Sequence, residues 1–204
     1  MIESFLRVPR TPGEIAADAV RVAGALSIVV AAIWFSATDA GILALALPGL
    51  LLPRFVGVRA WFDITYGLTV LLATWSNVLD LYRSVPWWDI PAHAICTAVM
   101  AAVAYLALAR LRVVPEPRSP AFSRRVPIVL VTVIGLALSA LWEMVEWAGY
   151  AFITDEIYVT YVDTIGDMAA GGLGALAAGI LLAYVRLDRD LSAANPAGRV
   201  RARA

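Results

Sequence analysis

The chain has 204 residues, of which 61% are hydrophobic and 16% charged, and its formal net charge is zero. Soluble domains carry about 25% charged residues, so this composition excludes an ordinary soluble domain and predicts a protein of the lipid bilayer. The single cysteine, Cys96, excludes an internal disulfide.

Long apolar runs predict six membrane-spanning helices, most of them close to the ~20 residues that a bilayer requires. The predicted spans are Ala19–Ser36, Ala40–Val56, Trp61–Leu81, Ile90–Leu111, Val126–Phe152 and Val162–Leu187. No clear cleavage site follows the first run, so we expect it to be a retained span. Pro48 and Pro53 interrupt the second run, for which a re-entrant or kinked segment is the alternative.

The arginines favour six crossings. The chain has no Lys, and six crossings place every Arg except Arg83 on one side of the membrane. If the second run did not cross, Arg54 and Arg59 would move to the other side and the separation would be poorer. Because positively charged loops remain in the cytoplasm, both termini are predicted to be cytoplasmic.

The predicted fold is therefore all-α: a polytopic membrane protein built as a bundle of six transmembrane helices. We expect three regions along the chain. They are a cytoplasmic N-terminal segment at residues 1–18, a six-span membrane domain at residues 19–187, and a cytoplasmic, disordered tail at residues 188–204.

Six ionisable residues lie inside or beside the last three predicted spans, in pairs at helical spacing. The pairs are Asp89 with His93, Glu143 with Glu146, and Asp163 with Asp167. Each ionisable group in hydrocarbon costs roughly 2.5–3.5 kcal/mol on insertion scales. Residues three or four apart share a helix face. The predicted topology brings all three pairs to the extracytoplasmic end of the helix bundle. We therefore expect them to converge in one polar pocket.

Small residues continue the stripe of the sixth span below its two acids. Gly171, Ala175 and Gly179 follow Asp163 and Asp167 at intervals of four. Such a small-xxx-small seam lets helices approach closely in lipid. It predicts a tight bundle of the last three spans beneath the polar pocket.

Carboxylates with an imidazole suit a divalent cation, and this donor set does not distinguish Mg, Mn, Zn or Fe. In this interpretation all six residues are metal ligands, and Glu143, Glu146 and His93 are also the candidate catalytic groups. Without a cation the carboxylates would repel one another and several would be protonated, which would suit a proton relay. The structural alternatives are helix caps for Asp89 and Asp163, and a packing hydrogen bond for His93.

Three motifs occur in order on the last three spans. They are D-x-x-x-H from Asp89 to His93, E-x-x-E-W from Glu143 to Trp147, and D-T-x-x-D-M from Asp163 to Met168. Together they resemble the YjdF-like family of small bacterial inner-membrane proteins, over roughly Asp80 to Leu187.

The resemblance implies a multi-pass protein of the bacterial plasma (inner) membrane, and the predicted topology puts the site near the extracytoplasmic face. The family brings no established activity. Ala94 stands where the family often has an aromatic residue, and the loop before the last span is shorter, so the pocket is expected to differ in shape.

Three functions remain open from the sequence. A metal-bound water could hydrolyse a lipid-linked substrate, although Arg83 is the only outer cation available for a phosphate. The acids could instead carry a proton or cation across the membrane, or the seam could serve a membrane scaffold or accessory subunit. The expected partners are the bilayer and a lipid-linked or small-molecule substrate; no nucleic acid is expected, and a homo-oligomer is compatible.

Overall fold

The computed structural model describes residues 1–117, 119–154, 157 and 159–189. Within these residues the chain is helical and forms no β-strand, apart from one isolated bridge between Val58 and Asp188. The helices are α1 (Ile2–Leu6), α2 (Pro12–Trp34), α3 (Ala37–Val56), α4 (Ala60–Val78), α5 (Leu81–Ser84), α6 (Asp89–Arg110), α7 (Arg125–Phe152) and α8 (Tyr161–Tyr184). The all-α prediction is confirmed.

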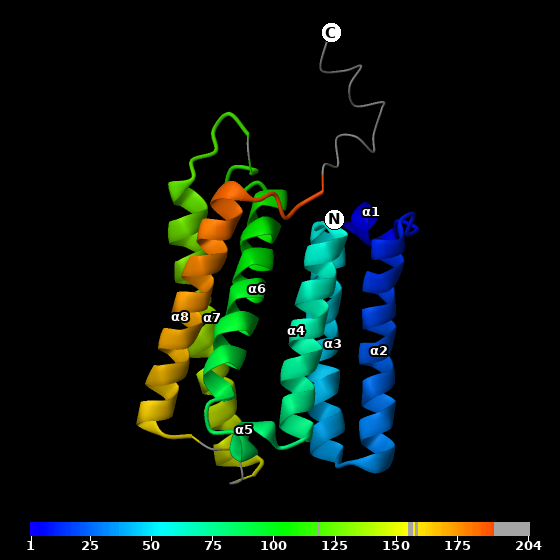
Figure 1. Cartoon of the computed structure of the whole chain (residues 1–204), viewed down its shortest axis with the longest axis vertical. Coiled ribbons are helices and arrows are strands. Elements are labelled where there is room, and N and C mark those ends of the chain that lie inside the picture. Colours follow the sequence, from blue (N-terminus) through cyan, green and yellow to red (C-terminus); the bar gives the residue numbers. More distant parts are fainter. Residues whose placement is uncertain (118, 155–156, 158, 190–204) are drawn as a thin grey trace.

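The six long helices run side by side in two groups of three (Figure 1). Helices α2, α3 and α4 contact one another, and so do α6, α7 and α8. The two groups meet mainly where α4 and α3 contact α6. We call the end that holds α1 and the α6–α7 loop the basic end, and the end where α6 and α8 begin the acidic end (Figure 1).

Five helices are long and apolar enough to cross a membrane: α2, α3, α6, α7 and α8. Their surfaces agree with this, as α2 illustrates. Its residues Val22 and Leu26 are 58% exposed, while Gly24, Ser27 and Ala31 are buried against other helices. Small residues inside and large apolar residues outside are typical of helices packed in lipid. The protein is therefore a multi-pass membrane protein.

Helix α4 is not among these five. It has 19 residues and runs alongside α2 and α3, but it carries Asp63 and Asn77, which lower its hydropathy. It occupies the position of the predicted third span, Trp61–Leu81. Its length matches that prediction better than its composition does.

The predicted second span is one continuous helix, α3, in spite of Pro48 and Pro53. Ser36 and Asp39 form a capping box at its start. It ends at Gly57, whose φ of 78° is a left-handed conformation that glycine adopts without strain. The chain therefore does not turn back within this segment.

The last helix ends at Tyr184, before the predicted end at Leu187. The following residues return to the connection between α3 and α4. The Arg59 N–H donates to the Leu187 carbonyl at 2.7 Å, and the Arg189 N–H donates to the Gly57 carbonyl at 2.9 Å. The predicted tail lies outside the described residues from residue 190 onward.

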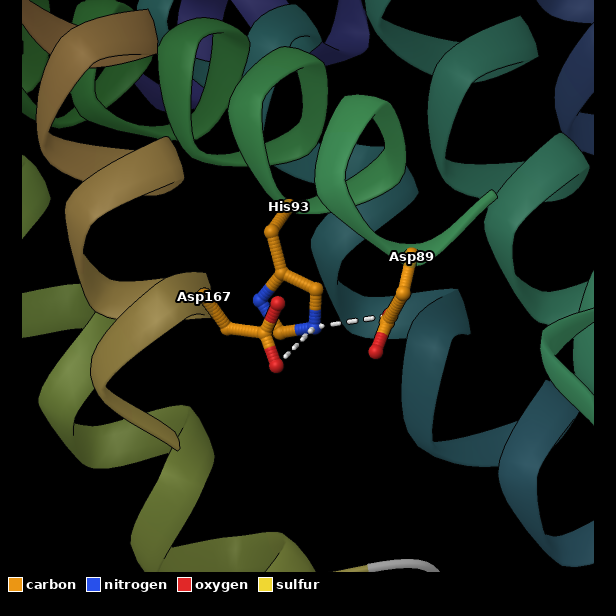
Figure 2. Close-up of side chains that lie close together, drawn as sticks. All are labelled: Asp89, His93 and Asp167. Atoms are coloured by element: carbon orange, nitrogen blue, oxygen red, sulfur yellow. Dashed lines mark ion pairs between the residues drawn. The ribbon is translucent and has the colours of Figure 1, made fainter. Parts of the chain in front are cut away.

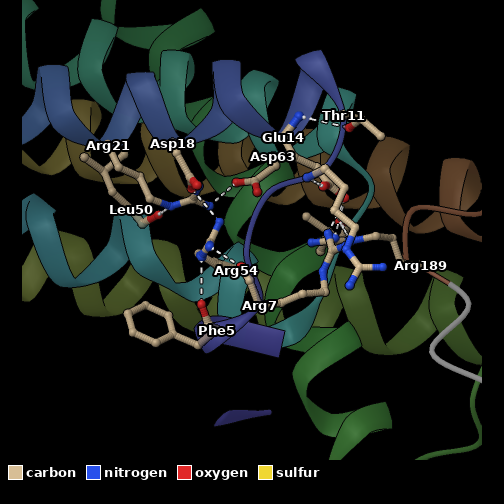
Figure 3. Close-up of polar contacts among 12 residues, drawn as sticks. Phe5, Arg7, Thr11, Glu14, Asp18, Arg21, Leu50, Arg54, Asp63 and Arg189 are labelled. Carbon is tan, nitrogen blue, oxygen red and sulfur yellow. Dashed lines mark hydrogen bonds and ion pairs between the residues drawn. The ribbon is translucent and has the colours of Figure 1, made fainter. Parts of the chain in front are cut away.

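A buried arginine holds the N-terminal helices together at the basic end (Figure 3). Arg21 of α2 is 8% exposed. Its guanidinium donates to Asp63 of α4 at 2.5 Å, to Asp18 at 2.9 Å and to the Leu50 carbonyl of α3 at 3.1 Å. One side chain thus links three helices, and its charge is matched by buried and half-buried carboxylates.

Two further arginines extend this network toward α1 and the C-terminal segment. Arg54 donates to Asp18 at 2.5 Å and to the Phe5 and Arg7 carbonyls. Arg189 donates to Glu14 at 2.7 Å (Figure 3). The basic end is therefore bound together by ion pairs from both ends of the chain.

We expect Arg21→Leu to destabilise the protein strongly. The substitution leaves Asp63 buried without its partner, and breaking a buried pair in this way costs about 3–5 kcal/mol. The readout is the thermal unfolding temperature in detergent. Arg125→Leu is the control, because Arg125 is exposed in the first turn of α7; exposed charges contribute about 0–1 kcal/mol. Equal shifts in the two variants would contradict this assignment.

Candidate functional site

His93, the chain's only histidine, lies at the centre of the predicted polar pocket. Its Nε2 atom is 3.2 Å from Asp89 Oδ1 and 3.9 Å from Asp167 Oδ2 (Figure 2). Its Nδ1 atom is 3.9 Å from Glu143 Oε1. Helices α6, α7 and α8 each contribute to this contact set. The predicted convergence of the three helices is therefore present.

Two overlapping groups of side chains share His93. In one, donor atoms of Asp89, His93 and Asp167 all lie within 4.8 Å of one another; in the other, the same holds for His93, Glu143 and Glu146. His93, Asp167 and Glu143 are buried, while Asp89 and Glu146 are half-buried. Five of the six predicted site residues thus belong to one or other of two groups that share His93.

Glu143 has an oxygen without a hydrogen-bond partner. Its side chain is 7% exposed and Oε1 is buried, yet no described group donates to this atom. The Thr164 hydroxyl of α8 forms a hydrogen bond with the same carboxyl group. Buried polar atoms are nearly always hydrogen-bonded, so an unpaired one requires an explanation.

Glu146 lies one turn beyond Glu143, and its position is fixed by a neighbouring indole. Trp142 Nε1 donates to Glu146 Oε1 at 2.8 Å. The sequence does not reveal this bond, because four-residue spacing alone does not show which side chains pair. The bond orients the Glu146 carboxylate.

Asp163 is the sixth predicted residue, and neither group includes it. It lies half-buried in the first turn of α8, where its N–H donates to the Thr160 side chain at 3.3 Å. An acid in the first turn interacts favourably with the helix dipole. The N-cap of α8 is Thr160 and not Asp163, and a role of Asp163 as a metal ligand stays a prediction.

Small side chains pack closely beneath the acidic cluster. Thr97 Oγ1 lies 3.3 Å from Ser139 Oγ in a buried hydrogen bond between α6 and α7. A Cβ atom placed on Gly171 would come within 2.0 Å of Ser139 Oγ. The seam that begins at Gly171 thus packs inside the molecule, directly beneath the acids.

Tyr82 is a neighbour of the site that the sequence does not reveal. It lies in the short helix α5, and its hydroxyl donates to the Ala73 carbonyl of α4 at 3.1 Å. Burial, followed by the nearby Cys96 and the charges of Asp89 and Glu146, raises the pKa of Tyr82. The phenol therefore stays protonated beside the carboxylates. Its only sequence signal is its place in the outer loop before Asp89.

In the part of the chain that the structure describes, no ion pair joins an arginine to these four carboxylates. The sequence contains no Lys, and it has no Arg between Arg83 and Arg110 or between Arg125 and Arg186. At the acidic end Arg83 forms a long, exposed contact with Asp80. His93 is therefore the one basic side chain among the described residues of the pocket, against four carboxylates.

Comparison with known proteins gives a family but no activity. No curated protein and no solved structure shows significant similarity to the chain. A family model described as "Predicted membrane protein (DUF2238)" matches residues 17–189. The match covers most of the chain, includes all of the site residues and agrees with the resemblance to YjdF-like proteins. The chain therefore belongs to this family of predicted membrane proteins.

Proposed function

We propose that this protein binds a divalent metal ion between Asp89, His93 and Asp167, and that it hydrolyses a lipid-linked substrate there. The observation that carries the proposal is the placement of His93: both of its ring nitrogens face carboxylates. A neutral imidazole has one N–H donor and one lone pair. One nitrogen would therefore direct its lone pair at a carboxylate unless a cation or a proton lay between them.

The distances suit a shared metal ion. The contacts of Nε2 with Asp89 and Asp167 are 3.2 Å and 3.9 Å long, and only the first is short enough for a hydrogen bond. Ligands that each lie roughly 2.0–2.2 Å from one ion are separated by roughly 3–4 Å. The contacts of Nε2 with Asp89 and Asp167 fall in that range.

Glu143 has a supporting role in this arrangement. Metal-bound histidines usually donate their other N–H to a carboxylate, which fixes the ring. Glu143 Oε1 faces Nδ1, is buried and accepts no other bond. We assign it to orient His93. The metal is Mg, Mn, Zn or Fe, because one imidazole with carboxylates suits each of them.

Three protein ligands would leave a fourth position for water, whose pKa the metal ion would lower. Glu146 is the candidate base that would take a proton from this water. The water oxygen would form a bond to the ester carbonyl carbon, the ester C–O bond would break, and the departing alkoxide would take the proton from Glu146. Carboxylates of this kind contribute about 10²–10⁴-fold to the rate.

The packing disfavours the two other functions. Below the pocket, a Cβ on Gly135 would lie 2.1 Å from the Ala175 Cβ, so α7 and α8 leave no room for an ion at that level. This close packing argues against a transport pathway between α6, α7 and α8. The small-residue seam packs within the chain, so it does not offer the surface that a scaffold would need.

We further propose six crossings in a bacterial inner membrane, with the acidic end outside. Helix α4 is about 28 Å long at 1.5 Å per residue, enough for a bilayer core. Arg21 and Arg54 lie at the basic end with the α6–α7 loop, which supports cytoplasmic termini.

This topology predicts the results of reporter fusions. A periplasm-active reporter inserted at Thr38 or at Pro86 should be active, and one at Pro120 should be silent. If α4 did not cross, the reporters at Thr38 and Pro86 would give opposite signals. That outcome would remove the sixth crossing and the common outer side of the site.

Metal content tests the proposed centre. After purification in detergent and dialysis with Mg, Mn, Zn or Fe in turn, we expect about one ion per chain by elemental mass spectrometry. His93→Gln and Asp167→Asn should each reduce it at least tenfold, because each removes a ligand. Asp80→Asn is the control, since Asp80 is exposed at the same end. Failure of all four metals to remain bound would refute the centre.

Lipid composition tests the reaction. In a host that lacks its own copy, we expect an ester-linked membrane lipid to accumulate, and expression of the wild-type chain to remove it. Glu146→Gln should restore no more than a hundredth of the rate and keep the metal, since it removes the base and no ligand. If the lipid composition stayed unchanged while the protein bound a metal, the proposed hydrolysis would be refuted and the metal site would remain.

A further inference from the structure

A groove between α7 and α8 leads from the outer surface of the bundle to Glu143. Its volume is about 330 Å³. Apart from Glu143 and Thr164, its lining is apolar: Ala140, Met144, Trp147, Val159 and Met168. Ligand pockets of about 300–1,000 Å³ with a few placed polar groups are typical of small-molecule sites.

We propose that this groove binds the hydrocarbon chain of a neutral ester lipid, and that the polar head of this lipid reaches the acidic cluster at Thr164 and Glu143. The inference rests on the proposed function, because it names the class of substrate for the same site. It adds the direction of entry, which is sideways from the bilayer between two helices.

The groove opens toward lipid. Met144 is 61% exposed and Trp147 is 55% exposed. Both lie on α7, whose length and composition suit a membrane crossing. On a helix that crosses the membrane the surrounding solvent is hydrocarbon or the interface, so lipid chains are the molecules that can reach an apolar groove there. A second protein is not needed to cover it.

The inner wall of the groove is the outer wall of the cluster. Glu143 lines the groove, while its Oε1 atom lies 3.9 Å from His93 Nδ1. Thr164, which forms a hydrogen bond with the Glu143 carboxyl group, also lines the groove. A hydroxyl-bearing head group at the inner end of the groove could form hydrogen bonds with these two polar side chains.

The charges select a neutral head group. None of the described residues that line the groove is basic, and the sequence has no Lys and no Arg between Arg125 and Arg186. A phosphate that entered beside Glu143 would meet a carboxylate with no arginine to balance it. A glycerol or other hydroxyl head, joined by an ester to a single chain, avoids this repulsion.

Photo-labelling tests the groove directly. The probe is a monoacylglycerol with a diazirine at the end of its chain, added to the purified full-length protein in detergent. Mass spectrometry should find the label on Met144 and Met168. Unlabelled monoacylglycerol should compete at least tenfold better than a lysophospholipid with the same chain and an anionic phosphate head.

Paired variants separate the groove from the rest of the surface. Ala140→Trp fills the groove and should reduce labelling at least tenfold, whereas Leu141→Trp, at an exposed position of α7 outside the groove, should not. Equal labelling in both variants, or equal competition by the anionic lipid, would overturn the inference.

Metal content measured on the same samples keeps the two proposals apart. Ala140→Trp should retain the metal, because Ala140 lies in the groove wall and outside both groups of candidate ligands. Bound metal with unspecific labelling would overturn the groove and leave the centre. Specific labelling without metal would support the groove and refute the centre.

Discussion

The site depends on how closely α8 approaches α6. A Cβ on Gly174 would lie 1.9 Å from the carbonyl oxygen of Ala94, the residue that follows His93. Only glycine permits this contact, since a backbone carbonyl cannot move aside as a side chain can. The approach fixes the distance between the two helices one to two turns below the acids. His93 and Asp167 can therefore face each other across a gap of 3.9 Å.

The charged side chains at the two ends of the bundle differ in how they are compensated. At the basic end, the guanidinium groups of Arg21 and Arg54 donate to carboxylates and backbone carbonyls, and this network connects the helices. At the acidic end, carboxylates surround His93 without an arginine, and Glu143 keeps an unpaired oxygen. A fold gains no stability from such an unbalanced group. The contrast fits a structural role for the basic end and the proposed ligand site at the acidic end.

The sequence predicts the helices and the approach of three acidic helices to His93, because hydropathy and four-residue spacing are local properties. It does not predict contacts between distant segments. The buried pair of Arg21 and Asp63 is one example, since the two residues lie 42 positions apart in the chain. The return of Leu187 to Arg59 is another, since an apolar run favours a longer helix. Asp163 belongs to the predicted set by spacing, but its level in the first turn keeps it outside both groups.

His93 lies between a solvent-accessible side and an apolar side, and this position bears on the proposed hydrolysis. Asp89, on its Nε2 side, has 29% of its side chain exposed near the start of α6, where water has access. Glu143, on its Nδ1 side, is buried and borders the apolar groove. An enzyme that hydrolyses a lipid must bring water and a hydrocarbon-bound ester to one point without drawing either far into the wrong phase. In the proposed reaction, water would reach His93 from the side of Asp89 and the proposed lipid chain from the side of Glu143, which would meet that requirement.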